Sequence, residues 1–355
     1  MQEKIFFNAL KIALKDSFYK IEKIKTVSLT FEFIWKNLEK FKRDLKIDLV
    51  ENNLDPEKEF LFLEKNQIKI VLKDDIEYPL LLKEIHQPPL GLYVKGDISS
   101  INKNINLAVI GSRKSTGYGK LACERIINGL ANSKINIISG LALGIDSWSH
   151  NLALQNNLKT FAFIGSGFNC LFPSANKNLS EKIIKTGGAI ISEYPINASP
   201  QKHYFVARNR LISGSSKAVL IVEAQEKSGT LITARFAMEQ DRDILAIPNN
   251  IFEKNSKGTN NLIREGAVLV ESAEDVFEEL GIEKNLALDF EKIDVSLSKV
   301  QKEIVNLFEK NNEIDVDFIY ENLGLPVEAI LSELTILELE GIIRQTKNEA
   351  YIKII

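Results

Sequence analysis

The stretch FVARNRLISGSSKAVLIVEAQEKSGTLITARFAMEQDRDILAIP, residues 205–248, decides the fold. Its centre, residues 218–222, is a continuous apolar run rich in branched side chains, which is the pattern of a strand buried on both faces of a parallel sheet. After a charged loop, Ser228, Gly229 and Thr230 open the next helix. Unpaired N–H groups and two hydroxyls gather there, at the positive end of a helix dipole. We expect this helix start to bind an anion, with phosphate as the first candidate.

Strands and helices alternate over residues 107–270, which predicts an α/β fold with a parallel sheet and helices on both faces. The predicted strands are residues 107–110, 135–139, 160–164, 189–192, 218–222 and 243–247. Ligands of such sheets bind beyond the carboxyl ends of the strands. Glycine follows three of these ends at once, as in Gly111-Ser112-Arg113. We therefore expect one shared, shallow site lined by backbone amides.

Composition limits the possible functions. The chain has 355 residues, 45% of them hydrophobic, so it can bury a large core in two or three domains. Because the net charge is −3 at pH 7, any binding of nucleic acid must depend on a local basic patch. Two cysteines without CxxC spacing fit a reducing cytoplasm, and three scattered histidines predict no metal site. No apolar run approaches the roughly 20 residues that cross a bilayer, so we expect a cytoplasmic protein without a cofactor.

Glycine content marks the domain that binds ligands. Seventeen of the 19 glycines lie within residues 91–281, where tight strand-to-helix turns need them. Earlier in the chain, apolar residues at helical spacing predict a small N-terminal helical domain over residues 1–67. The sheet domain then covers residues 68–282. Two short strands are predicted at its beginning, at residues 68–71 and 92–95.

The last part of the chain predicts a different domain. A charged linker covers residues 283–294, and residues 295–355 follow with three amphipathic helices and a strand pair, the pattern of a winged helix. The helices are predicted at residues 296–309, 315–322 and 326–340. Because the third helix is acidic, we interpret this domain as one that contacts proteins rather than a DNA groove.

Basic and aromatic side chains cluster at the predicted binding edge. Arg113 follows a buried strand at a Gly-Ser turn, where a cation and backbone amides can meet phosphate. Arg208, Asn209 and Arg210 bring two guanidiniums and an amide to the segment before the central strand. Phe205 precedes them, and two interpretations of its ring stay open: stacking on an unpaired base, or packing in the core.

Two glycine-rich segments in this region resemble nucleotide-binding motifs, but their position in the chain does not fit those motifs. GYGKLA, residues 117–122, fits GxGxxA, but it begins well past the preceding strand. No acidic residue closes the next strand at Ser139, which argues against dinucleotide binding. GSRKSTGYGK also lacks the spacing of a Walker A loop, so ATP hydrolysis is not indicated.

Acidic residues near the strand ends have structural interpretations. Glu193 and Glu223 each follow a strand, and with no nucleophile or metal ligand beside them we expect them to hold loop amides or the arginines of the basic segment. Asp146 and His150 share one helical face. For this pair two hypotheses stay open: Asp146 caps the helix while His150 packs or bonds nearby, or the pair contacts a ligand.

Several ordered motifs give the sequence a family resemblance. They read AVIGSRKSTGYG, ISGLALGIDSWSHNLAL, FVARNRLISGSS with VLIVEAQEKSGTLITARFAMEQDRDILAIP, and GTNNLIREGA, and they fall within residues 68–270. Together they resemble the family of the DNA-processing protein DprA, also called Smf. The resemblance implies an extended Rossmann-like domain that binds single-stranded DNA and forms a homodimer. It further implies a mediator without catalytic turnover, which loads RecA recombinase onto incoming DNA in natural transformation.

The residue patterns and the resemblance together place the DNA contacts. They are Gly111, Ser112, Arg113, Lys177, Phe205, Arg208, Asn209, Arg210, Ser228, Gly229 and Thr230. After the third strand, Phe172 and Ser174 stand where the family commonly has tyrosine and lysine, so the cation of that edge must come from Lys177. The resemblance places the dimer and RecA surface around residues 260–266.

An enzyme is the second hypothesis. Nucleotide phosphoribohydrolases of the lysine-decarboxylase-like group have a Rossmann-like fold and a GTxxE element that resembles residues 229–233. Here the glutamate position is Thr233, which cannot supply the carboxylate that would stabilise an oxocarbenium-like transition state. A third hypothesis, a pure protein-interaction scaffold, would leave the arginines at the strand ends without a purpose.

Overall fold

The computed structural model of the chain describes residues 1–25, 29–46, 54–282, 297–308, 311, 313–339, 342–346 and 350–353. The chain divides into two compact units, Met1–Leu286 and Ala287–Ile355. The predicted linker at residues 283–294 lies outside the described residues. The finer domain boundaries stay a prediction.

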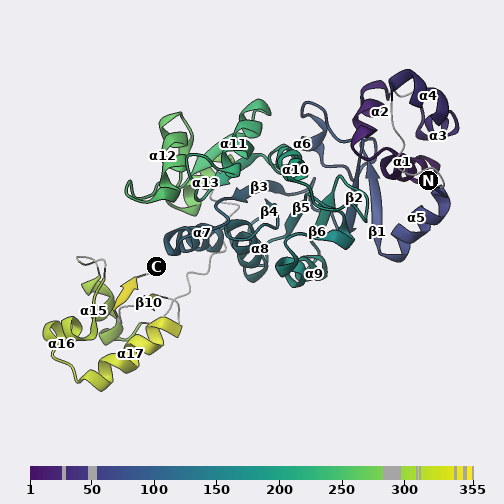
Figure 1. Cartoon of the computed structure of the whole chain (residues 1–355). Helices are drawn as coiled ribbons and strands as arrows, with labels where there is room; N and C mark the ends of the chain where they lie inside the picture. The colour runs from purple at the N-terminus through teal and green to yellow at the C-terminus, as the bar shows by residue number, and fades with distance from the viewer. Residues whose placement is uncertain are drawn as a thin grey trace. The chain divides into compact units, whose positions relative to one another are not determined.

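A nine-stranded sheet forms the centre of the first unit (Figure 1). Its strands are β1 (Ile68–Leu72), β2 (Gly91–Gly96), β3 (Ile105–Ile110), β4 (Ile135–Ser139), β5 (Thr160–Ile164), β6 (Ala189–Ser192), β7 (Ala218–Ile221), β8 (Asp243–Ala246) and β9 (Val268–Leu269). From edge to edge their order is β1-β2-β6-β5-β4-β3-β7-β8-β9. Pairing is parallel from β6 to β9, whereas β2 pairs antiparallel with both β1 and β6. The α/β fold with a parallel sheet is confirmed. Of the two early strands that extend it, β2 runs opposite to the others, whereas β1, antiparallel to β2, runs in the same direction as β6.

Helices cover both faces of the sheet, which explains the continuous apolar strands. One face carries α7 (Gly117–Gly129), α8 (Ile145–Gln155) and α9 (Lys177–Lys185), and the other carries α10 (Lys202–Gly214) and α11 (Gly229–Glu239) (Figure 1). The shorter helices α6 (Leu80–Lys83), α12 (Lys257–Arg264) and α13 (Ala273–Glu279) complete this part. All residues of β4, β5 and β7 are buried. On the α10 face, Ile110, Phe163 and Ile221 of the strands pack in one core with Leu211 and Ile212.

The strand order fixes where a ligand can bind. From β3 the chain first builds β4, β5 and β6 on one side and then returns to build β7, β8 and β9 on the other. The order therefore reverses between β3 and β7, and in open α/β sheets the crevice at such a switch point is the usual ligand site. The loops that leave β3 and β7 carry Arg113 and Ser228, so the topology brings the predicted phosphate-binding residues together.

The N-terminal helices pack on the antiparallel edge of this sheet. They are α1 (Gln2–Leu14), α2 (Tyr19–Ile24), α3 (Phe31–Lys36), α4 (Leu38–Leu45) and α5 (Pro56–Lys65). Phe7 contacts Phe18 and Phe31 edge-on and lies 6.0 Å from the ring of Tyr93 in β2. The buried hydroxyl of Tyr93 donates a hydrogen bond of 2.8 Å to Oδ1 of Asn8. These helices thus share a core with the sheet.

The second unit contains the three predicted helices and the strand pair. The elements are α15 (Lys299–Leu307), α16 (Val316–Leu323), α17 (Val327–Leu339), β10 (Ile343–Gln345) and β11 (Tyr351–Lys353). A capping box between Ser298 and Gln301 begins α15. Ile304, Ile319 and Leu334 form the buried centre. The element types are confirmed, and the winged-helix assignment stays a prediction.

The turn after β3 is held by the start of α8. Gly144, the residue before α8, has φ +81° and ψ −131°, a conformation that side chains with a Cβ rarely adopt. A Cβ on Gly144 would lie 2.2 Å from the carbonyl oxygen of Ser112. The next amide, that of Ile145, donates to the same oxygen over 3.1 Å. Glycine at this position therefore allows the helix to fix the backbone that carries Arg113.

We predict that Gly144→Ala lowers the free energy of unfolding by about 2–4 kcal/mol, because it adds backbone strain and a clash with the main chain. Urea unfolding of the purified protein measures the change. Gly117→Ala is the matched control: Gly117 begins α7, and a Cβ there meets nothing within 4 Å. Equal stability of the two variants would contradict this account of the turn.

Candidate nucleic-acid interface

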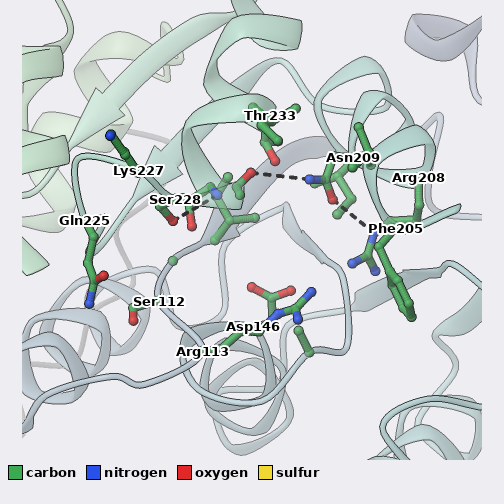
Figure 2. Close-up of a pocket in the computed structure, with 18 of the residues that line it drawn as sticks. Ser112, Arg113, Asp146, Phe205, Arg208, Asn209, Gln225, Lys227, Ser228 and Thr233 are labelled. Atoms are coloured by element: carbon green, nitrogen blue, oxygen red, sulfur yellow. Dashed lines mark hydrogen bonds between the residues drawn. The ribbon is translucent and has the colours of Figure 1, made fainter. Parts of the chain in front are cut away.

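A cavity of about 570 Å³ lies at the switch point, between the ends of β3 and β7 and the helices α10 and α11 (Figure 2). Residues from four separate segments of the chain line it. Of the predicted contacts it brings together Gly111, Ser112, Arg113, Phe205, Arg208, Asn209, Ser228, Gly229 and Thr230. Lys177 and Arg210 are not among its lining residues.

One wall of the cavity is the N-terminus of α11. The sequence-based prediction of this helix start is confirmed: Ser228 is the N-cap, and its hydroxyl accepts a hydrogen bond of 3.1 Å from the amide of Thr230. Gly229 is exposed, and a Cβ there would meet nothing within 4 Å, so a ligand can approach the backbone closely. The positive helix end and its N–H groups form a wall suited to an anion.

Four exposed cations surround this wall. Arg113 and Lys114 follow β3, Lys202 begins α10, and Lys227 precedes the cap of α11. Among the lining residues Asp146 alone carries a carboxylate. The cavity is therefore strongly positive although the whole chain is acidic. The three lysines were not among the contacts predicted from the sequence, although each lies within three residues of a predicted contact, which could have indicated them.

Arg208 lines the floor of the cavity, but its side chain is almost entirely buried. Its Nη1 donates hydrogen bonds to the carbonyl oxygens of Gly140 and Phe163, at the ends of β4 and β5. Burial lowers the pKa of Arg208 to about 10, while the nearby Asp146 acts in the opposite direction. Burial likewise raises the pKa of Asp146, against the effect of Arg208 and of the loop amides. Arg208 thus positions the strand ends and contributes its charge from below.

Asn209 and Arg210 follow Arg208 on α10 and point to different places. The amide nitrogen of Asn209 approaches the carbonyl oxygen of Gly229 at 3.5 Å, which connects α10 to the start of α11 (Figure 2). Arg210 forms a bidentate ion pair with Glu193, with both N–O distances 2.8 Å, on the other side of α10. Arg210 therefore lines a second cavity and not the one at the switch point.

Phe205 forms a partly exposed aromatic wall. Its ring lies beneath the guanidinium of Arg113, 5.9 Å from the Cζ atom to the ring centroid. A Cβ on Gly165 would lie 2.9 Å from this ring, so the loop after β5 needs glycine to admit it. The ring of Phe172 lies 5.6 Å away, in the loop that leads to the exposed Lys177 at the start of α9.

The predicted roles of the two glutamates are confirmed. Glu193 holds Arg210, and Glu223 accepts hydrogen bonds from the amide (3.0 Å) and the hydroxyl of Thr116. Gly119 in α7 lies against the side chain of Glu223. The GxGxxA segment therefore packs on a carboxylate.

Asp146 and His150 both have structural partners. Gly144 is the N-cap of α8, so the capping role predicted for Asp146 is wrong in detail: its carboxylate accepts from the amide of Gly140 at 3.2 Å instead. The hydroxyl of Thr160 donates to the carbonyl oxygen of Ile137 and so accepts from Nδ1 of His150, at 2.6 Å. Burial, reinforced by Arg208, lowers the pKa of His150 to about 3. His150 is therefore a neutral core residue.

Two further findings concern the described residues. They contain no group of three or more histidine, cysteine, aspartate or glutamate side chains placed to hold a metal ion. None of the helices in the described segments has the length and apolar character needed to cross a membrane.

The fold and the site define a class: a Rossmann-like protein with a cationic cavity at the switch point of its sheet. Comparison with known families identifies the member of this class. Residues 69–281 match the family of DNA recombination-mediator protein A, and the chain belongs to that family. Its members are DNA-binding recombination mediators rather than enzymes.

Relatives and solved structures agree with this assignment. The protein Smf of Escherichia coli is 35% identical over 306 residues, which cover 80% of this chain and 77% of the relative. The structure of DNA processing protein A from Streptococcus pneumoniae matches with a TM-score of 0.59 and 36% identity, covering 74% of this chain and 96% of that one. The Helicobacter pylori protein matches with a TM-score of 0.54 and 29% identity, covering 60% and 95%; its structure concerns how that protein binds single-stranded DNA.

The depressed pKa of His150 predicts a pH dependence of stability. Between about pH 6.5 and pH 3 the unfolded chain binds a proton that the folded chain does not, so the stabilisation from neutral His150 is complete above pH 6.5 and is lost as the pH falls. His150→Asn keeps a donor for Thr160 and removes this titration. The free energy of unfolding that His150→Asn loses relative to the wild type, measured with urea, should shrink by up to about 1.4 kcal/mol per pH unit below pH 6.5. A cost that is constant from pH 7.5 to pH 5 would contradict a buried neutral imidazole.

Proposed function

We propose that this chain binds single-stranded DNA in the cavity at the switch point, and that as a cytoplasmic homodimer it loads a RecA recombinase onto incoming DNA in natural transformation. One observation carries the DNA part: four exposed cations, a helix N-terminus and an aromatic ring surround the same cavity. Phosphates suit the first two and an unpaired base suits the third. The single-stranded DNA bound by the Helicobacter pylori relative supports the same ligand.

In this mechanism each wall of the cavity binds a different part of the strand. Arg113, Lys114, Lys202 and Lys227 hold successive phosphates of the strand, because flexible cations neutralise the backbone without reading sequence. The start of α11 donates N–H groups to a phosphate that the exposed Gly229 allows to come close. A duplex cannot use the ring of Phe205, since its bases are stacked inside, so this ring favours a single strand.

The two predicted cations outside the cavity have separate roles in this proposal. Lys177 follows the loop of Phe172, which contacts Phe205, and we assign it to a phosphate leaving the cavity at this edge. Arg210 is held by Glu193 and shapes the other side of α10 rather than binding phosphate.

The hydrolase hypothesis finds little support in this cavity. Glycoside-type hydrolysis needs two carboxyl groups on opposite sides of the scissile bond. Among the described residues that line the cavity only Asp146 has one, and it is buried and bonded to the amide of Gly140. Thr233 occupies the position that would need the second.

We place the dimer and RecA surfaces at the far edge of the sheet, around residues 260–266 in α12 and the strand β9 that follows. An edge strand offers main-chain groups to a partner. Beside α12, Ile251 and Phe252 are 75% and 88% exposed, which is unusual for large apolar side chains. We assign the C-terminal unit to protein contacts, because α17 exposes Leu331 and Ile336 among glutamates.

Arg113→Ala should weaken binding to single strands of every sequence and reduce the slope of log K against log salt by about 0.7, the value for one phosphate contact on a single strand. Fluorescence anisotropy with labelled oligo-dT between 50 and 200 mM salt measures both. Arg125→Ala is the matched control, since Arg125 is exposed on α7 outside the cavity. An unchanged slope in Arg113→Ala would remove Arg113 from the phosphate path.

Phe205→Ala should cost about 1–3 kcal/mol of binding free energy through lost stacking, and it should leave the salt slope of the wild type unchanged. The same anisotropy series distinguishes this pattern from that of Arg113→Ala. If Phe205→Ala bound single-stranded DNA with the affinity of the wild type, the ring of Phe205 would only pack in the core and would not contact a base.

A further inference from the structure

A second cavity, of about 660 Å³, lies on the other side of α10. Alternate faces of this helix serve the two cavities: Phe205 and Asn209 line the first, and Tyr204 and Arg210 line the second. The remaining walls come from α1, α2 and the turn between them, from the loop after β6, and from Glu59 of α5 and Gln87. A strand held in the first cavity therefore has a neighbouring cavity across one helix.

The charges of the second cavity differ from those of the first. Among the described residues, six charged side chains line it and their charges sum to zero: Lys11, Lys15 and Arg210 against Glu22, Glu59 and Glu193. A phosphate has no net attraction to such a site. An uncharged group with both donors and acceptors suits it better.

One carboxylate oxygen of this cavity lacks a donor. Oε1 of Glu22 is buried without a hydrogen-bond partner, whereas both oxygens of Glu193 accept from Arg210. Burial raises the pKa of Glu22, and the nearby Lys11 opposes that rise. An orphaned buried acceptor is costly unless a ligand with N–H groups satisfies it.

The cavity also has planar surfaces. Tyr194 and Tyr204 stack with ring centroids 3.8 Å apart, and Tyr19 is 49% exposed. Lys11, whose ammonium lies 4.5 Å from the ring centroid of Phe18, adds a cation beside Glu22. Aromatic rings accept a planar heterocycle, and a carboxylate next to a cation matches an edge with N–H donors beside acceptors.

From these features we propose that the second cavity binds a guanine base of the single strand. The N1–H and N2–H groups of guanine face the carboxylate of Glu22, O6 and N7 face Lys11, and the ring lies against the tyrosines. Thymine has a single N–H between two carbonyls and cannot satisfy the carboxylate in this way. This inference rests on the proposed function and adds a base preference to it.

Titration of the full chain with deoxyguanosine and with thymidine, followed by ligand-observed NMR, tests the proposal without any phosphate. We expect deoxyguanosine to bind at least about tenfold more tightly than thymidine, and Glu22→Gln to remove that preference, since a good paired contact is worth about 1–3 kcal/mol. Tyr19→Ala, at an exposed position, should also weaken the binding of deoxyguanosine. Glu57→Gln, an exposed carboxylate of α5 outside the cavity, should not.

Oligo-dT and the same strand with one central dG separate this inference from the proposed function. We expect the wild type to bind the dG strand more tightly than oligo-dT, and Glu22→Gln to bind the two strands equally. Arg113→Ala should weaken the binding of both strands but leave the binding of deoxyguanosine unchanged. Equal affinity for the two nucleosides, or an unchanged preference in Glu22→Gln, would overturn the guanine site. The proposed function would stand without the guanine site if oligo-dT still bound. If neither strand bound, the proposed function would fail whatever the result for the nucleosides.

Discussion

The hydrogen bonds of one buried guanidinium support the whole binding edge. Arg208 donates to the carbonyl oxygens at the ends of β4 and β5 from within α10, and Asp146 compensates its charge from the start of α8. Loss of one member of such a buried set leaves an uncompensated charge, which is strongly destabilising. The geometry of the cavity, in which α10 presents Phe205 on one side and Tyr204 on the other, depends on this anchor.

The three arginines make different contacts because they are buried to different extents. Arg113 is exposed at a glycine-supported turn and can meet solvent-borne phosphate, whereas Arg208 satisfies strand ends and Arg210 satisfies Glu193. Three residues of the same chemical type thus face solvent, main-chain carbonyls and a carboxylate respectively. A local cluster of exposed cations makes this cavity positive although the net charge of the whole chain is negative.

The fold was largely predictable from the sequence. The six central strands had apolar runs long enough to indicate their positions, and β4, β5 and β6 match the predicted residues. What local patterns could not supply was the partner of each strand: nothing in residues 68–72 and 91–96 indicates that they extend the sheet, or that residues 91–96 run opposite to the other strands. The β3 and β7 loops were expected to share a site because parallel strands end on one edge, and they line one cavity.

The roles of individual side chains were less predictable, because they depend on tertiary burial. Arg208 and Arg210 are two residues apart on one helix, and only the packing of α10 decides that the first is buried in the sheet and the second lies in another cavity. The lysines that complete the cavity come from separate loops and look like ordinary surface residues in the sequence. The second cavity joins α1 and α2 to residues about 170 positions later, a contact that no local pattern encodes.

The central claim is that this cavity holds the backbone of an unpaired strand. Competition between labelled oligo-dT and the matching duplex, at two salt concentrations, tests it most directly. We expect the unlabelled single strand to displace the probe at much lower concentration than the duplex does, and the affinity to fall steeply with salt because several phosphates are neutralised. Equal competition by the duplex, or binding that is insensitive to salt, would contradict it.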